Sequence, residues 1–246
     1  MQKSGNTILI TGGGSGIGAA LAHEWHEAGN QVIIAGRRKA ALDEVTQRHP
    51  GMVARTLDME DPAAIADFAE KLAADFPALN VVVHNAGIMV AEERVDLPIA
   101  ESMVITNLLG PIRLTHALLP HLLAQPAATL LTVSSGLAFV PYVITPTYSA
   151  TKAGIHSWSM AMREQLRGTS VEVIELAPPG VQTDLMPGMA ENPNMMPLDA
   201  FIAEVMDLLA QQPPLQEICV ERVKILREAE RRGEFDQVFA TLNQLH

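Results

Sequence analysis

The fold is decided by one stretch near the start of the chain, TILITGGGSGIG, which spans Thr7–Gly18. Its first part, Thr7–Ile10, is an apolar run typical of a buried strand, and Ile17–Ala28 after it is typical of an amphipathic helix. Glycines between a strand and a helix let the backbone turn sharply and approach a phosphate, and the helix N-terminus offers free N–H groups. The stretch therefore predicts a nucleotide-binding turn; a flexible glycine loop without a ligand is the alternative.

The rest of the chain alternates short apolar runs with longer amphipathic stretches. The apolar runs, typical of strands covered on both faces, are Gln31–Ala35, Val53–Leu57, Val81–His84, Thr129–Val133, Val171–Leu176 and Glu217–Val220. The expected helices are Ala40–His49, Pro62–Phe76, a long one ending near Ala124, Tyr148–Arg167 and Leu198–Gln211. This alternation predicts an α/β fold of the Rossmann type, a doubly wound, mainly parallel seven-stranded sheet with helices on both faces.

Length, composition and charge limit the classes of protein to which the chain can belong. Its 246 residues suit one domain, residues 1–246, and 48% of them are hydrophobic, so a large core can form. We expect a substrate loop at about 184–200, rich in Met, Pro and Asn, and a helical tail at about 221–246. The net charge of −11 argues against binding to nucleic acid or to an anionic membrane.

Cysteine usage and hydropathy indicate a cellular compartment. The single cysteine, Cys219, excludes an internal disulfide, and no Cys/His spacing typical of zinc is present. His23 and His26 do not have the H-E-x-x-H spacing, so we expect a solvated helix face there and no metal. Neither a signal peptide nor an apolar run of bilayer length is visible in the sequence, which predicts a cytoplasmic protein without a membrane partner.

The tip of the second expected strand, Ala35-Gly36-Arg37-Arg38, bears on the choice of nucleotide. In dinucleotide-binding folds an acidic residue about 20 positions beyond the glycine turn binds the ribose of NAD, whereas an arginine suits the 2′-phosphate of NADP. Gly36 stands where the acid would be, and Arg37 and Arg38 can pair with a phosphate. The sequence favours NADP(H) over NAD(H); the alternative is that both arginines are solvated surface charges.

Tyr148 and Lys152 lie four positions apart in an expected helix, so both side chains project from one face. A phenol has an ordinary pKa of about 10, and a neighbouring ammonium group favours the phenolate and lowers that pKa. A tyrosine tuned in this way suits general acid–base chemistry. Such pairs are also common on helix surfaces, so the pair predicts a catalytic site only together with other residues.

Several motifs together resemble the short-chain dehydrogenase/reductase family. They occur in the family's order: Gly12-x-x-x-Gly16-x-Gly18, Asn85-Ala86-Gly87, Thr106-Asn107-Leu108-Leu109-Gly110, Ser135 and Tyr148-x-x-x-Lys152. The resemblance covers nearly the whole chain, from Thr7 to about Cys219. The segments Ser134–Phe139 and Ser170–Pro179 are similar to a narrower group, the DltE-type oxidoreductases.

The resemblance implies an enzyme, an NADP(H)-dependent oxidoreductase that moves a hydride between the nicotinamide and a carbonyl or alcohol carbon. Its catalytic residues would be Ser135, Tyr148, Lys152 and Asn107. Ser135 and Tyr148 would polarise the carbonyl, and Tyr148 would donate the proton. Lys152 would bind the nicotinamide ribose and lower the pKa of the phenol, and Asn107 would kink its helix and hold a water connected to the lysine.

The motifs and the strand tips also imply which residues bind the cofactor. The predicted NADP(H)-binding residues are Gly12, Gly14, Ser15, Gly16, Ile17, Gly18, Arg37, Arg38, Asp58, Asn85, Ala86, Gly87, Tyr148, Lys152, Pro178, Val181 and Thr183. One segment departs from the family pattern, because Pro179 takes the place of a glycine and Gly180 is shifted by one position. Proline fixes φ and lacks an N–H, so the geometry of this loop is left open.

The sequence leaves more than one hypothesis for the class of activity and for the oligomeric state. A non-catalytic NADP(H)-binding sensor or scaffold is the rival hypothesis, because fold alone does not give activity. The complete set of serine, tyrosine, lysine and asparagine favours an enzyme acting on a small-molecule carbonyl or alcohol substrate. The methionines of the substrate loop either line an adaptable pocket or anchor the loop to the core. By resemblance, the helices around Asn107–Leu123 and Tyr148–Arg167 imply a homodimer or homotetramer.

Overall fold

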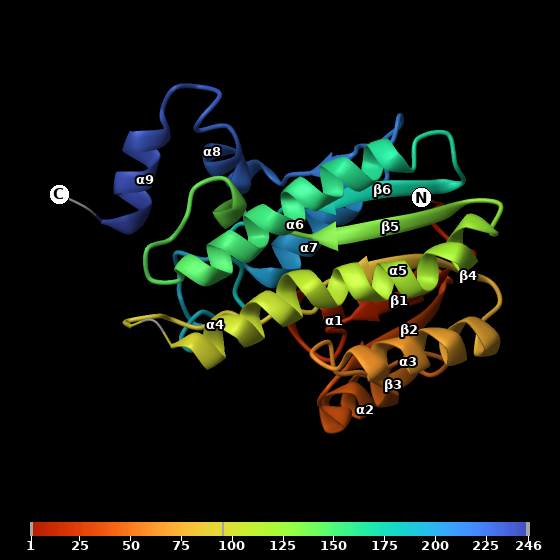
Figure 1. Cartoon of the computed structure of the whole chain (residues 1–246). Helices are drawn as coiled ribbons and strands as arrows, with labels where there is room; N and C mark the ends of the chain where they lie inside the picture. Colours follow the sequence, from red (N-terminus) through yellow and green to blue (C-terminus); the bar gives the residue numbers. More distant parts are fainter. Residues whose placement is uncertain (1, 95, 245–246) are drawn as a thin grey trace.

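A parallel β-sheet forms the centre of the computed structural model, which describes residues 2–94 and 96–244 (Figure 1). The strands are β1 (Thr7–Thr11), β2 (Gln31–Gly36), β3 (Val53–Thr56), β4 (Leu79–His84), β5 (Ala128–Val133), β6 (Val171–Leu176) and β7 (Glu217–Ile218). Within the described residues the sheet has seven strands in the order β3-β2-β1-β4-β5-β6-β7, and every neighbouring pair is parallel. The predicted fold class is confirmed.

Helices cover both faces of the sheet. They are α1 (Gly16–Glu27), α2 (Lys39–Arg48), α3 (Pro62–Asp75), α4 (Leu97–Val104), α5 (Gly110–Leu123), α6 (Pro146–Gln165), α7 (Leu198–Leu209), α8 (Lys224–Arg227) and α9 (Phe235–Asn243). Alternate side chains of β1 enter two different hydrophobic cores, since Ile8 and Ile10 pack with α1, α2 and α7, whereas Leu9 packs with α3 and α5. This two-sided burial explains why the strands read as continuous apolar runs.

The long helix expected to end near Ala124 is confirmed as a continuous helical run over residues 97–123, with a π-helical turn inside it. α4 ends at Val104, a π-helical turn spans Ile105–Leu109, and α5 begins at Gly110. Pro111 has no N–H to continue the helical hydrogen bonds, and Gly110 packs closely against the next layer, where an added Cβ would lie 2.9 Å from the Met59 carbonyl oxygen.

The last strand is shorter than expected, because the segment beside it cannot continue the ladder of hydrogen bonds. β7 covers two residues, and its final ladder bond runs from Ala177 N to Ile218 O at 3.0 Å. The next residue of that segment whose N–H would face β7 is Pro179, which has no N–H to donate.

The tail after β7 holds two short helices, α8 and α9, joined by turns over residues 228–233. α8 and α9 form a small apolar core of their own around Val140, Ala229 and Val238, so they lie against the segment that leads into α6 (Figure 1). None of the helices in residues 2–94 and 96–244 has both the length and the apolar character needed to cross a bilayer.

Candidate active site

A cleft of about 1070 Å³ opens at the carboxyl ends of the strands. It adjoins β1 and β4, where the strand order reverses and where ligands bind in open α/β sheets. The predicted site residues that line it are Gly12, Gly14, Ser15, Gly16, Ile17, Arg37, Arg38, Asp58, Asn85, Ala86, Gly87, Ser135, Tyr148, Lys152, Pro178, Val181 and Thr183. The volume is slightly above the range of roughly 300–1,000 Å³ typical of ligand pockets.

The glycine turn is tied to the end of β4 by a compact set of hydrogen bonds. The Thr11 hydroxyl oxygen accepts from the backbone N–H groups of Asn85 and Ala86, each at 3.1 Å. Gly12 has a left-handed φ of +69°, and an added Cβ there would lie 2.8 Å from the Ala86 Cα. Only glycine fits this position, which brings the backbone of the turn against the Asn-Ala-Gly segment.

Gly18 is predicted to bind the cofactor but does not line the cleft. It is buried, and an added Cβ would lie 2.4 Å from both the Gly12 carbonyl oxygen and the Asn85 Nδ2. The role visible in the structure is close packing of α1 against the turn, which a side chain would prevent. The prediction of cofactor contact is therefore corrected for this residue.

The two arginines at the tip of β2 have different partners. The Arg38 guanidinium donates to the Ser15 hydroxyl oxygen at 3.0 Å, which places it beside the glycine turn. The Arg37 guanidinium instead forms an ion pair with Glu60 at 3.2 Å, and the same carboxylate oxygen accepts from the Ser102 hydroxyl at 2.8 Å. Arg38 is therefore better placed than Arg37 to meet a phosphate bound at the turn.

Tyr148 is the buried phenol of the cleft, with 5% of its surface exposed. Burial raises the pKa of Tyr148 above its ordinary value, and a hydrogen bond with Ser135 opposes this shift. The Lys152 ammonium lies 5.5 Å from the ring centroid. Burial is the larger influence on the phenol, and the lowering of its pKa by Lys152 stays a prediction.

The Lys152 ammonium is held at the end of β5, where it donates to the Val133 carbonyl oxygen at 2.8 Å. Burial lowers the pKa of Lys152 to about 8, and the carboxylate of Glu175 opposes this shift. Glu175 is 1% exposed in β6, with its two oxygens 2.9 and 2.8 Å from the His156 Nδ1. We did not predict Glu175, although a carboxylate inside an apolar strand is a visible signal for a buried charge.

Asn107 lies behind the cleft rather than on its wall. Its amide oxygen accepts from Ile88 N at 2.8 Å, and its amide nitrogen donates to Ile88 O at 2.9 Å and to the Thr151 hydroxyl at 3.2 Å. An added Cβ on Gly87 would lie 3.4 Å from the Asn107 Oδ1 and 3.8 Å from the Lys152 Nζ. Asn107 thus fixes the segment after Asn-Ala-Gly and lies near Lys152.

The unusual Pro-Pro-Gly segment after β6 is explained by packing against the substrate loop. An added Cβ at Gly180 would lie 2.3 Å from the Met195 sulfur, and the Gly180 carbonyl accepts from Met196 N at 2.8 Å. The shifted glycine therefore makes room for Met195. Pro178 still lines the cleft, and its carbonyl accepts from Gly136 N at 2.8 Å.

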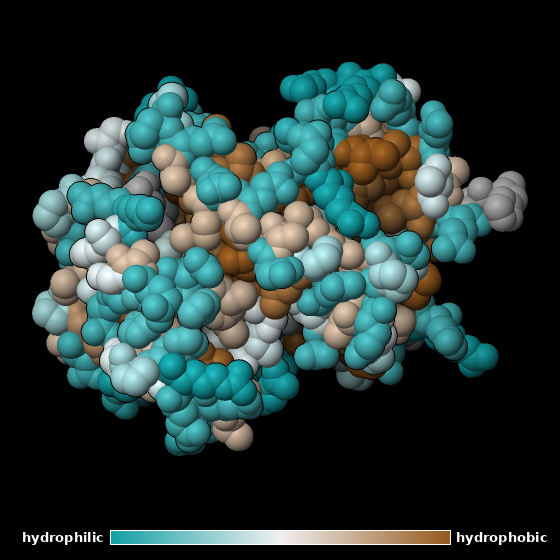
Figure 2. All heavy atoms as spheres, turned by 180° about the vertical axis from the view of Figure 1, so that it is seen from behind, coloured by the Kyte–Doolittle hydropathy of each residue, from teal (hydrophilic) through white to brown (hydrophobic). Residues whose placement is uncertain are grey.

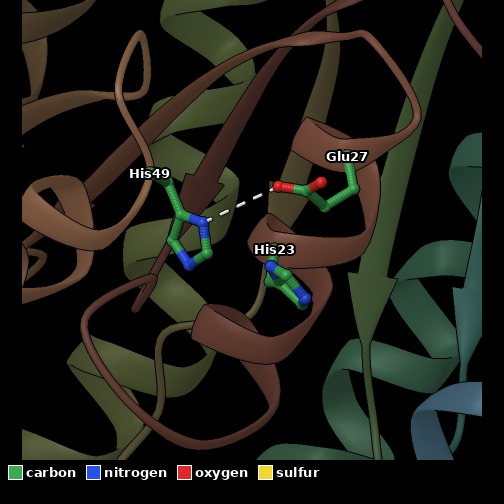
Figure 3. Close-up of side chains that lie close together, drawn as sticks. All are labelled: His23, Glu27 and His49. Carbon is green, nitrogen blue, oxygen red and sulfur yellow. Dashed lines mark ion pairs between the residues drawn. The ribbon is translucent and has the colours of Figure 1, made fainter.

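A group of polar side chains outside the cleft brings together His23 and Glu27 of α1 with His49 at the end of α2 (Figure 3). Their potential ligand atoms lie within 4.8 Å of one another, and His49 Nδ1 is 4.0 Å from Glu27 Oε1. His23 and Glu27 are exposed, as expected of a solvated helix face, and none of the three residues lines the cleft.

Several cleft residues escaped prediction from the sequence. They comprise Met89 and Val90 after the Asn-Ala-Gly motif and Ile225, Leu226 and Leu242 of the tail. The first two directly follow a predicted motif, so their position beside it was a usable signal. The tail residues are brought to the cleft by tertiary packing alone, for which the sequence offers no local pattern.

A doubly wound sheet, a glycine turn at its switch point and a buried tyrosine–lysine pair in the adjoining cleft define a Rossmann-type oxidoreductase. The sequence model described as short chain dehydrogenase matches residues 6–194, and the chain belongs to that family. The chain is similar to the uncharacterized oxidoreductase DltE of Bacillus subtilis (strain 168), with 38% identity over 254 residues, 99% of this chain and 98% of the relative. The predicted family resemblance is confirmed.

Solved structures show the same similarity. A short-chain dehydrogenase from Streptomyces avermitilis is 25% identical with a TM-score of 0.81, over 98% of this chain and 96% of that chain. A metagenomic short-chain oxidoreductase in complex with NADP is 27% identical with a TM-score of 0.75, over 88% of this chain and 96% of that chain.

Proposed function

We propose that the chain is an NADP(H)-dependent oxidoreductase that interconverts a carbonyl compound and an alcohol by hydride transfer. The observation that carries this proposal is one shared cleft. It holds the hydrogen-bonded hydroxyl groups of Ser135 and Tyr148 and the buried ammonium of Lys152, and the same cleft reaches the glycine turn.

The residues present fit a dinucleotide with a 2′-phosphate. Ser15 precedes α1 without a side-chain capping bond, which leaves the first N–H groups of that helix available to a diphosphate. Arg38 lies at the same turn, and Gly36 leaves no acid to repel a phosphate. The NADP complex of the metagenomic relative supports this choice. When bound, NADPH would supply the hydride, and the protein supplies orientation and electrostatics.

The side chains of the cleft have complementary roles in such a reaction. Because its pKa is raised, Tyr148 keeps its proton near neutral pH and can donate it to the oxygen that becomes the alcohol. The Ser135 hydroxyl, next to that phenol, can donate a hydrogen bond to the same oxygen. Lys152 remains mostly protonated below a pH of about 8, so its charge favours the developing alkoxide. Asn107 is a positioning residue, because it acts through Ile88 and Thr151.

The chain offers a matched control for the test, since it contains two tyrosines and both line the cleft. Following NADPH absorbance with a panel of aldehydes and ketones, we expect Tyr148→Phe to lower turnover about 10²- to 10⁴-fold, the usual range for a general acid. Tyr142→Phe should stay within a few-fold of the wild type. If both Tyr148→Phe and the wild type bind NADPH but neither oxidises it with any carbonyl, the protein is a sensor or scaffold instead.

A further inference from the structure

The C-terminal tail forms part of the wall of the cleft. Ile225 and Leu226 of α8 and Leu242 of α9 line it. Seen from behind, apolar side chains gather in a hollow at the end of the molecule that α8 and α9 form (Figure 2). The family match ends at residue 194, before the tail begins, so this wall lies outside the part of the chain that the family model covers.

The tail is anchored directly to the segment that joins the two catalytic hydroxyl groups. An added Cβ on Gly136, the residue after Ser135, would lie 2.7 Å from Leu226 and 2.9 Å from Val223. In the middle of the segment, Asn243 accepts from Val143 N at 2.8 Å and donates to the Pro141 carbonyl at 3.1 Å. The tail wall is therefore held against this segment by packing at Gly136 and by hydrogen bonds at Pro141 and Val143.

The substrate loop contributes the facing apolar groups. Met186, Met189 and Met195 line the cleft, and thioether side chains adapt their shape to varied apolar ligands. Arg222, the cationic residue that the tail contributes to the lining, donates to the Asn194 carbonyl at 2.6 Å and so bridges the tail to this loop. Ile225 is 59% exposed, and such an apolar side chain at a cleft mouth is available to a ligand.

We propose that the tail and the methionines of the substrate loop together bind the apolar body of the substrate. This inference rests on the proposed function and names its substrate class: an aldehyde or ketone that carries a long alkyl or aryl group. The carbonyl lies at Ser135 and Tyr148, and the apolar group extends between α8 and the loop.

A homologous series of straight-chain aldehydes, from propanal to decanal, tests the inference with the intact protein and NADPH. Each methylene that becomes buried should raise kcat/KM about fourfold, until the chain fills the pocket. Ile225→Asp should flatten this increase, so that kcat/KM falls at least about tenfold more for decanal than for propanal. Leu97→Asp is the matched control, because Leu97 is equally exposed, at 62%, but lies outside the cleft, so the full length dependence should remain.

A binding measurement keeps this inference separate from the proposed function. Calorimetric titration of decan-2-one into the NADP⁺-saturated protein should give a Kd about tenfold weaker for Ile225→Asp than for the wild type and for Leu97→Asp. Turnover that is independent of aldehyde length would overturn the inference and leave the proposed function standing. Absence of turnover with every carbonyl would overturn the proposed function. The inference would then depend on the titration, and equal affinities for decan-2-one would overturn it.

Discussion

Replacing Arg38 by alanine removes a guanidinium that lies 3.0 Å from the Ser15 hydroxyl, at the entrance to the glycine turn. A hydrogen bond to a charged group contributes about 1.5–3 kcal/mol. Loss of one such bond to the 2′-phosphate should therefore weaken the Kd for NADPH about 10- to 150-fold. NADH has no 2′-phosphate, so its Kd should change by less than about threefold.

The neighbouring arginine should contribute less, for a reason visible in the structure. To reach a phosphate, Arg37 has to leave Glu60, its ion-pair partner at 3.2 Å. The side chains of this pair are 50% and 31% exposed, and exposed pairs contribute roughly 0–1 kcal/mol. We expect Arg37→Ala to weaken NADPH binding by less than about fivefold, because the arginine exchanges one anionic partner for another.

Fluorescence titration with NADPH and NADH measures both effects, and Arg48→Ala is the control. Arg48 lies at the opposite end of α2 and pairs with Glu44. The reasoning is refuted if Arg38→Ala weakens NADPH and NADH binding equally, or if Arg37→Ala has the larger effect. The double variant should lose the preference for NADPH altogether.

Three further outcomes are expected. Gly18→Ala should destabilise the fold by about 1–3 kcal/mol in urea titration, because its Cβ would lie 2.4 Å from Gly12 O and Asn85 Nδ2; an unchanged midpoint would contradict the packing role. Lys152→Met should abolish turnover yet stabilise the fold at pH 7 by on the order of 3 kcal/mol, since a pKa lowered from 10.5 to about 8 disfavours the charged native state. That gain should shrink as the pH rises from about 8 to 10.5, and a constant gain would disprove the assignment. Met160 is 51% exposed on α6, and Met160→Asp should convert the expected two-fold assembly into monomers, as measured by light scattering. A wild type that is already monomeric would contradict this prediction.

The features of the fold and of the site that follow from local sequence could be predicted. The glycine turn and the strands depend on residue type and spacing over a few positions, so Gly12 and Ile8 occur where expected. The spacing of Tyr148 and Lys152 on one helix likewise places both in the cleft.

The features that could not be predicted from the sequence depend on contacts between distant segments. The raised pKa of Tyr148 comes from burial, which no spacing encodes. Gly18 supports packing because α1 lies against the turn, and Ile225 reaches the cleft because the tail folds back over Gly136. The resemblance implied a kink at Asn107, but local spacing does not show that the helix forms a π-helical turn at Ile105–Leu109.

The most direct measurement of the central claim uses NADPH deuterated at the carbon that donates the hydride. After single turnover with an aldehyde, mass spectrometry and NMR locate the label in the alcohol. Hydride transfer in this cleft predicts deuterium on the former carbonyl carbon with the wild type and almost none with Tyr148→Phe. Label released to water, or equal labelling by both proteins, would contradict it.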